Sequence, residues 1–161
     1  MRIVNGEGIL NPDIMIIGEA PGKEEEVMGE PFIGKSGKLL DKVLKECEIK
    51  REECYITNAI KVNINKPTDE DISNWMYLLH YEVKQINPKI IITLGIVPYK
   101  AITQHNKFFT ENRSKMINHW LTKDIKLLAT YHPSYCLRKP SATDILIEDF
   151  KKAAKYVKSI K

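Results

Sequence analysis

The chain has 161 residues, of which 43% are hydrophobic and 29% charged, so its size and composition fit one folded domain and exclude a fibrous or disordered protein. No apolar run approaches the roughly 20 residues of a membrane span, and residues 1–10 lack the layout of a secretory signal. We therefore expect a single domain over residues 1–161, acting as a monomer in the cytoplasm of a cell, or of a host cell if the source is viral.

Charge and cysteine content narrow the classes further. The net charge of +4 and the pI of about 8.8 permit a polyanionic partner, but the lysines alternate with glutamates, so most of them form a solvated surface. The three cysteines, Cys47, Cys54 and Cys136, are odd in number and none lies in a C-x-x-C pair. They predict buried free thiols rather than disulfides or a four-cysteine metal site.

The first third of the chain predicts a strand, a loop and a helix. Residues 13–18 are an apolar run after an Asn-Pro turn signal, which is typical of a buried strand. Glycine and proline then indicate a loop over residues 18–37. Residues 37–47 repeat apolar side chains at helical spacing, and Ser36 is a candidate N-cap. The expected buried face of this helix consists of Leu40, Val43, Leu44 and Cys47.

Three strands and three helices are expected in the remainder. Strands are predicted at residues 54–59, 89–94 and 125–130, and a short helix at residues 98–102. Thr68 and Asp71 form a capping-box pattern at the start of a helix that Pro88 ends. Its apolar stripe consists of Ile72, Trp75, Leu79, Val83 and Ile86. Residues 103–122 show no regular pattern. A last helix over residues 143–160 would bury Leu146, Phe150, Ala153 and Val157.

The alternation of strands and helices predicts an α/β fold, with three α/β/α layers around a four-stranded parallel sheet. Ligands of such sheets bind outside the carboxyl ends of the strands. Four segments fall there, namely residues 18–22, Asn58, Gly95 and residues 131–134. Each alone could be a turn or a satisfied structural group, but their joint occurrence at strand ends favours one site. No phosphate-binding loop, dinucleotide fingerprint, G-x-S-x-G elbow or H-E-x-x-H motif is present.

These segments carry a family resemblance. Residues 18–22 (GEAPG) and 30–40 (EPFIGKSGKLL) are similar to the opening motif of family 4 uracil-DNA glycosylases. Residues 55–58 (YITN) with Lys61 resemble the second motif of that family, and residues 88–95 its third strand. Residues 131–134 (YHPS), followed by Leu137 and Arg138, resemble its closing motif. The resemblance covers roughly residues 11–156, and its motifs are specific in combination.

The resemblance implies an enzyme that hydrolyses the N-glycosidic bond of deoxyuridine in single- or double-stranded DNA and releases uracil from a flipped nucleotide. Phe32 would stack on the base, and the amide of Asn58 would read its Watson–Crick edge. His132 would donate a hydrogen bond to uracil O2 as charge builds on the leaving group. Glu19 would position water and stabilise the cationic sugar, since Ala20 occupies the place of a water-activating aspartate in a related family.

Further contacts are implied around these residues. Backbone groups of Gly18, Ala20 and Gly22 would meet the base. The DNA-binding residues would be Gly34, Ser36, Gly37, Ser134, Leu137, Arg138 and Lys139. Those at the start of the helix, and the two basic residues, suit phosphate. Leu137 is either a wedge into the gap left by the flipped base or a simple packing residue.

The match to the family breaks at its cofactor. Family 4 members typically bind a [4Fe–4S] cluster through four cysteines, two of them before the first motif, where this chain has none. Val62 and Trp75 stand at the other two ligand positions, so we expect no cluster, no other metal or cofactor, and apolar packing in its place. Losing the cluster leaves other functions open: a non-catalytic reader of uracil in DNA or replication accessory protein, or a glycosylase for another damaged base. Glu19, Asn58 and His132 favour catalysis, and a small-molecule nucleotide hydrolase is disfavoured because the sequence carries no phosphate-metal carboxylate cluster.

Overall fold

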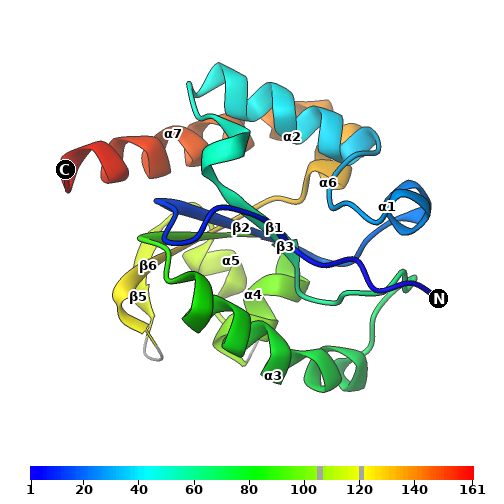
Figure 1. Cartoon of the computed structure of the whole chain (residues 1–161). Helices are drawn as coiled ribbons and strands as arrows, with labels where there is room; N and C mark the ends of the chain where they lie inside the picture. Colours follow the sequence, from blue (N-terminus) through cyan, green and yellow to red (C-terminus); the bar gives the residue numbers. More distant parts are fainter. Residues whose placement is uncertain (105–106, 120–121) are drawn as a thin grey trace.

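The computed structural model of the chain describes all residues except 105, 106, 120 and 121, and the side chains of residues 119, 122 and 123 are also outside the description. A central sheet lies between two layers of helices (Figure 1). The sheet has six strands in the order β1-β3-β2-β4-β6-β5. The strands are β1 (Glu7–Gly8), β2 (Ile14–Gly18), β3 (Tyr55–Asn58), β4 (Ile90–Leu94), β5 (Met116–His119) and β6 (Thr122–Thr130).

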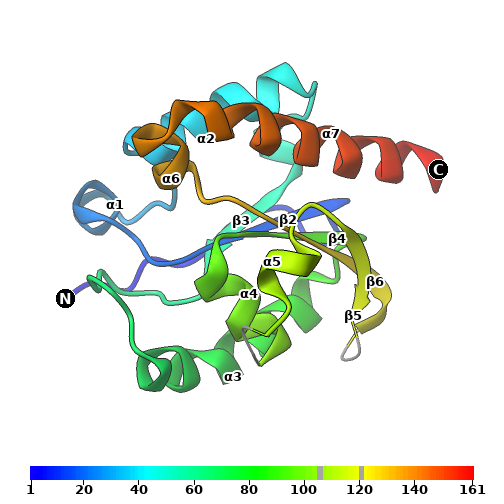
Figure 2. The ribbon, with the colours of Figure 1, turned by 180° about the vertical axis from the view of Figure 1, so that it is seen from behind.

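The helices cover both faces of the sheet. Helices α2 (Lys35–Glu46), α6 (Pro133–Arg138) and α7 (Thr143–Ser159) lie on one face, and α3 (Asp69–Ile86), α4 (Ile96–Thr103) and α5 (Phe109–Asn112) lie on the other (Figure 2). Helix α1 (Lys23–Met28) follows β2 at the carboxyl ends of the strands. Two short 3-10 helices, Arg51–Glu53 and Pro140–Ala142, complete the connections. None of these described helices has the length and hydropathy that crossing a membrane requires.

Alternation along the strands divides the core in two. In β2, Ile14 and Ile16 pack with α2 and α7, whereas Met15 and Ile17 pack with α3 and α4. Both faces of the inner strands are therefore apolar, as parallel strands covered by helices require. The predicted faces of α2 and α7 are buried, and the capping box of Thr68 and Asp71 is present at the start of α3. The prediction of an α/β fold is confirmed.

The predicted number of strands was too small. The four expected strands are present and parallel, but β1 and β5 add antiparallel partners at the two edges of the sheet. Strand β1 has only two residues, both exposed, so no pattern of burial marks it in the sequence. Strand β5 and helix α5 fall in the stretch 103–122, where no element was assigned and where residues 105, 106, 120 and 121 lie outside the description.

Two further differences concern the loops that carry the predicted site. The stretch 18–37 was expected to be a loop, but it contains α1, and α6 begins directly after His132. The predicted N-cap at Ser36 was wrong, because α2 begins two residues earlier and Gly34 takes the cap position. The differences concern helices of only six residues and the exact position of one helix end. Hydrophobic periodicity resolves neither.

Candidate functional site

A cavity of about 370 Å³ opens at the carboxyl ends of the parallel strands. Residues from the ends of β2, β3 and β6, from α1 and from the start of α2 line it. They are Glu19, Ala20, Pro21, Gly22, Lys23, Glu24, Glu25, Phe32, Gly34, Lys35, Ser36, Asn58, His132 and Ser134. The cavity therefore brings together residues from three of the four segments that the strand ends predict, and the fourth, Gly95, lies directly behind His132.

Asn58 presents an unused acceptor to the site. It is the last residue of β3, its side chain is 2% exposed, and no described residue donates a hydrogen bond to its Oδ1 atom. A buried carbonyl oxygen without a partner costs about 1–3 kcal/mol, so such atoms in native proteins call for an explanation. A ligand that brings an N–H group to this oxygen would remove that cost.

The absence of a side chain at Gly18 leaves space that the side chains of Phe32 and Asn58 occupy. A Cβ atom at this position would lie 2.3 Å from Cζ of Phe32 and 2.5 Å from Oδ1 of Asn58. No real side chain tolerates such distances, and the backbone of Gly18 does not have a positive φ. The requirement for glycine is therefore steric: the ring and the amide pack directly on the main chain of β2.

The backbone around Phe32 is held from two sides. Phe32 has a φ of 53°, in the left-handed region that bulky residues rarely adopt. The guanidinium of Arg51 donates to the carbonyl oxygens of Pro31 and Phe32 over 2.8 and 2.9 Å, and pairs with Asp41 over 2.7 Å. On the other side, a Cβ at Gly37 would lie 2.0 Å from the Phe32 carbonyl oxygen, so α2 packs directly under this loop.

His132 is fixed in one tautomer. It is the N-cap of α6, and its Nδ1 atom accepts a hydrogen bond of 3.0 Å from the backbone N–H of Ser134. Burial, together with the nearby Arg138 guanidinium, lowers the pKa of His132 to about 4. The ring is therefore neutral near pH 7 and carries its proton on Nε2. It also stacks on Phe32, with ring centroids 5.8 Å apart and planes at 30°.

Glu19 supplies the carboxylate of the cavity. It follows β2 directly, and its carbonyl oxygen accepts from the N–H of Ile60 over 3.0 Å, which ties the turn after β2 to the end of β3. Its side chain is partly buried, and burial raises the pKa of its carboxyl group. The small side chain of Ala20 beside it leaves the cavity open. A carboxylate in this setting can hold a water molecule and face a developing positive charge.

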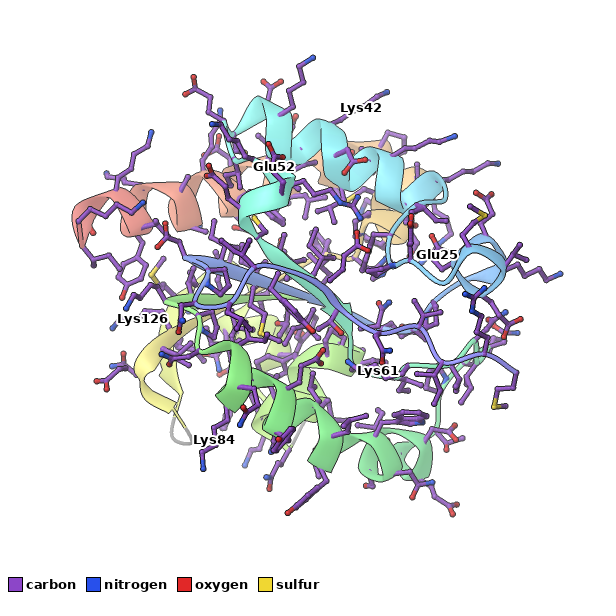
Figure 3. The ribbon with its side chains drawn as sticks, in the orientation of Figure 1. Glu25, Lys42, Glu52, Lys61, Lys84 and Lys126 are labelled. Atoms are coloured by element: carbon purple, nitrogen blue, oxygen red, sulfur yellow. The ribbon has the colours of Figure 1, made fainter. Side chains whose placement is uncertain are left out.

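Glu25 is a structural member of the site that the motifs did not reveal. Its Oε1 accepts from the N–H of Gly22 over 3.1 Å, and its Oε2 accepts from the N–H groups of Ile33 and Gly34 over 2.8 and 2.7 Å. The side chain lies between α1 and the start of α2 (Figure 3). A glutamate three residues after a helix-starting glycine is the sequence signal that could have indicated half of this arrangement.

The remaining predicted residues lie at or beside the cavity. Gly34, Ser36 and Ser134 line it, although the N–H groups of Gly22 and Gly34 are already bound by Glu25. Gly37 does not line it, because it packs under Phe32. Leu137 is 47% exposed at the end of α6. Arg138 and Lys139 are exposed next to it.

The three cysteines lie in a different part of the core from Val62 and Trp75, the residues at two expected cluster-ligand positions. Cys47, Cys54 and Cys136 are free and buried, and all pack in the layer between the sheet and α2, α6 and α7. Val62 and Trp75 pack in the opposite layer, with Val62 buried and Trp75 partly buried. Among the described residues, no group of three or more His, Cys, Asp or Glu is arranged to hold a metal ion. The residues present therefore do not fit a cysteine-bound cluster.

Comparison with known proteins gives one consistent family. Residues 6–159 match the profile of the Uracil DNA glycosylase superfamily. A type-4 uracil-DNA glycosylase of Thermotoga maritima is 37% identical over 98% of this chain and 84% of its own length. The type-4 enzymes of Sulfurisphaera tokodaii and Archaeoglobus fulgidus are 37% and 35% identical, each over 92% of this chain and over 72% and 79% of their own lengths. The chain therefore belongs to the uracil DNA glycosylase superfamily, among the relatives of its type-4 enzymes.

Proposed function

We propose that this cavity takes up a uracil flipped out of DNA and hydrolyses its N-glycosidic bond. The observation that carries the proposal is that one cavity holds both the Oδ1 acceptor of Asn58, which has no partner among the described residues, and the Nε2–H donor of neutral His132. Uracil presents an N3–H donor and an O2 acceptor side by side on one edge. The Asn58 acceptor is complementary to the N3–H donor, and the His132 donor is complementary to the O2 acceptor.

Recognition of uracil follows from the amide of Asn58. Its Oδ1 accepts from N3–H while its amide nitrogen donates to O4. Cytosine carries an acceptor at N3 and a donor at C4, which leaves both amide groups unpaired. A buried polar site of this kind discriminates strongly against the wrong partner, because the desolvated groups have no alternative partner. Phe32 supplies stacking, which adds affinity for any flat base.

The reaction breaks the bond between C1′ of the sugar and N1 of the base. The bonding electrons leave with uracil, and the Nε2–H of His132 stabilises the charge on O2 while the imidazole stays neutral. The sugar becomes cationic, and the carboxylate of Glu19 faces it and orients a water molecule. The water oxygen then bonds to C1′, Glu19 accepts a water proton, and the uracil anion takes up a proton on release.

The DNA around the flipped nucleotide would contact the rim of the cavity. Ser36 at the start of α2 offers its hydroxyl and N–H groups for phosphate oxygens, and Ser134 at the start of α6 offers its hydroxyl, since its N–H is bound to His132. Leu137 is exposed beside Arg138 and Lys139. This arrangement favours the wedge over the packing residue, with Leu137 entering the gap in the stack and the two basic side chains on phosphate.

We further propose that the protein works without an iron–sulfur cluster. The three cysteines are free and buried in the layer between the sheet and α2, α6 and α7, whereas Val62 and Trp75 pack in the opposite layer, so the thiols do not converge on the expected ligand positions. Burial also raises the pKa of the Cys47 thiol to about 11 and that of the Cys54 thiol to about 12. Anaerobically purified protein should lack the absorption near about 400 nm of a [4Fe–4S] centre. Its native thiols should also react with Ellman's reagent only after unfolding. Absorption with stoichiometric iron and sulfide would contradict the proposal.

The proposed enzyme acts as a monomer on uracil-containing DNA in the cytoplasm. All the groups assigned to the reaction come from one chain, so no second copy is needed to complete the cavity. The free, buried thiols suit a reducing compartment. The alternative of a non-catalytic reader would keep the same base contacts, and measuring cleavage separates the two.

The test is uracil release from single- and double-stranded oligonucleotides that carry one uracil, with thymine and hypoxanthine in its place as controls. We expect release of uracil alone and an abasic site sensitive to alkali. The variant Asn58→Ala should excise uracil far more slowly while keeping the fold, because it removes the reading amide. Tight, uracil-dependent DNA binding without cleavage would favour the reader, and excision of hypoxanthine instead would indicate a different base range.

A further inference from the structure

A buried ammonium group lies directly behind the base-reading residue. Lys61 lies three residues after the end of β3 (Figure 3). Its side chain is 3% exposed. Its Nζ atom donates to the backbone carbonyl of Asn58 over 2.5 Å, to Oγ1 of Thr57 over 2.7 Å and to Oε1 of Glu82 over 2.6 Å. All three protons of the ammonium group are therefore used.

Glu82 on α3 holds this lysine in place. Besides Lys61, its carboxylate accepts from the hydroxyl of Tyr55 over 2.8 Å and from that of Thr57 over 3.3 Å. Burial lowers the pKa of Lys61, which Glu82 partly offsets, and burial together with Glu82 raises the pKa of Tyr55. The tyrosine thus remains a donor, and the network links β3 to the helix that covers it.

Stability alone does not account for such a pair. Bringing two charges out of water costs several kcal/mol per ion, and apolar residues of similar volume usually serve stability as well or better. The side chains on either side, Ile60 and Val62, are apolar and buried on the same face of the sheet. A charged residue between them is therefore better explained by the particular group that it contacts.

That group is one end of the peptide unit between Asn58 and Ala59. Its N–H donates to the Gly18 carbonyl over 2.8 Å, and in a planar trans peptide the C=O points the opposite way, towards the β1 edge. Strand β1 pairs only with Tyr55 and Ile56, so it ends before it could bond this carbonyl. Lys61 takes the place of the missing strand partner, and the peptide is held at both ends.

We propose that Lys61, kept in position by Glu82, is a positioning residue that fixes the main chain at Asn58 so that its amide meets the uracil edge. This inference rests on the proposed function. Neither side chain lines the cavity, so both act through Asn58 and not on the substrate. Small displacements of a reading group are costly, because about 1 Å of misplacement can reduce a rate by roughly 100-fold.

A double-mutant cycle tests this coupling. Single-turnover excision is measured for wild type, Lys61→Met, Asn58→Ala and the combined variant. We expect Lys61→Met to lower the rate by roughly 10- to 100-fold in the wild-type background and by less than about 3-fold when Asn58 is already alanine. Equal losses in both backgrounds would overturn the inference, whereas an inactive wild type would contradict the proposed function instead.

A second variant separates positioning from folding. Lys61→Met leaves Glu82 as an unpaired buried charge, so Lys61→Met with Glu82→Leu should restore thermal stability without restoring the excision rate. A matched control is Lys100→Met, which breaks the more exposed pair that Lys100 of α4 forms with Asp69 of α3 and should leave the rate unchanged. Full activity of the folded Lys61→Met, Glu82→Leu protein would overturn the inference.

Hydrogen exchange tests the peptide unit between Asn58 and Ala59 directly and does not depend on enzymatic activity. In the Lys61→Met, Glu82→Leu protein, hydrogen exchange of the Ala59 amide should accelerate by about 10-fold or more, because the carbonyl end of its peptide is released. The amide of Ile92, in the middle of β4, serves as the internal control. Unchanged protection of the Ala59 amide would overturn the inference whether or not uracil is excised.

Discussion

The Nδ1 atom of His132 accepts a hydrogen bond from the backbone N–H of Ser134, so the start of α6 selects the tautomer that carries its proton on Nε2, in a residue that lines the cavity. The two residues are separated by Pro133, which has no N–H of its own to compete for the ring nitrogen. The donor that the proposed reaction requires is thus set by three consecutive residues and needs no partner from elsewhere in the chain.

Replacing this donor should slow excision without unfolding the protein. His132→Ala removes one preorganised hydrogen bond to the leaving base, which is typically worth about 3 kcal/mol, or roughly 100-fold in rate. Because the pKa of His132 is about 4, the ring gains a proton only as the pH falls towards 4. The wild-type rate should therefore show no step near pH 6.5, and NMR titration of the ring should report the low pKa directly.

Glu19 should control the acid limb of the pH profile. Burial raises the pKa of its carboxyl group above the ordinary value of 4.5, and the reaction needs the ionised form. Excision should therefore fall, as the pH is lowered, at a higher pH than an ordinary glutamate would cause. Single-turnover rates across this range measure the effect. Glu19→Gln should be slow at every pH, and an unshifted acid limb in that variant would contradict the assignment.

A single methyl group at Gly18 should close the base site. The Cβ atom of Gly18→Ala would meet Phe32 at 2.3 Å and Asn58 at 2.5 Å, so both side chains must move out of their present positions. Since the Gly18 backbone has no positive φ, the substitution is unfavourable because of steric clash and not because of backbone strain. We expect roughly 100-fold slower excision, with binding of undamaged DNA retained. Uracil release at the wild-type rate would show that Phe32 and Asn58 do not flank the base.

Arg51 should matter for activity although it does not line the cavity. Arg51→Ala removes the two hydrogen bonds that hold the carbonyls of Pro31 and Phe32, in a loop whose φ at Phe32 is already unfavourable. We expect about 10-fold slower excision, because the stacking ring becomes less well ordered. Lys50→Ala is the matched control, since the side chain of the neighbouring Lys50 forms an exposed pair with Glu53. Equal rates for the two variants would contradict a role for Arg51.

The sequence predicted the strands and helices that carry a long periodic apolar pattern. It missed the short elements that carry no such pattern. The four parallel strands and the faces of α2, α3 and α7 follow from long apolar patterns, which burial on both sides of a sheet imposes. Helix α1 was missed because glycine and proline surround its six residues. Strand β1 was missed because it is two residues long and exposed.

The residues of the candidate site likewise divide into those that the sequence predicted and those that it missed. Glu19 and His132 follow strand ends and Asn58 is the last residue of β3, so topology alone is enough to bring them together. The supporting contacts of Glu25 and Arg51 involve residues eight to twenty positions away along irregular backbone. No periodic pattern encodes such pairs, and only the folded loops reveal them.

The three hydrogen bonds of Glu25 have a consequence for how the protein admits its substrate. One largely buried carboxylate joins the turn after β2 to the loop that carries Phe32, so neither can swing outward without stranding a desolvated charge. The entrance consequently has a set width before DNA arrives. If the cavity takes up the flipped base as proposed, selection depends on which extruded bases fit this entrance, and the conformational change falls on the DNA rather than on the protein.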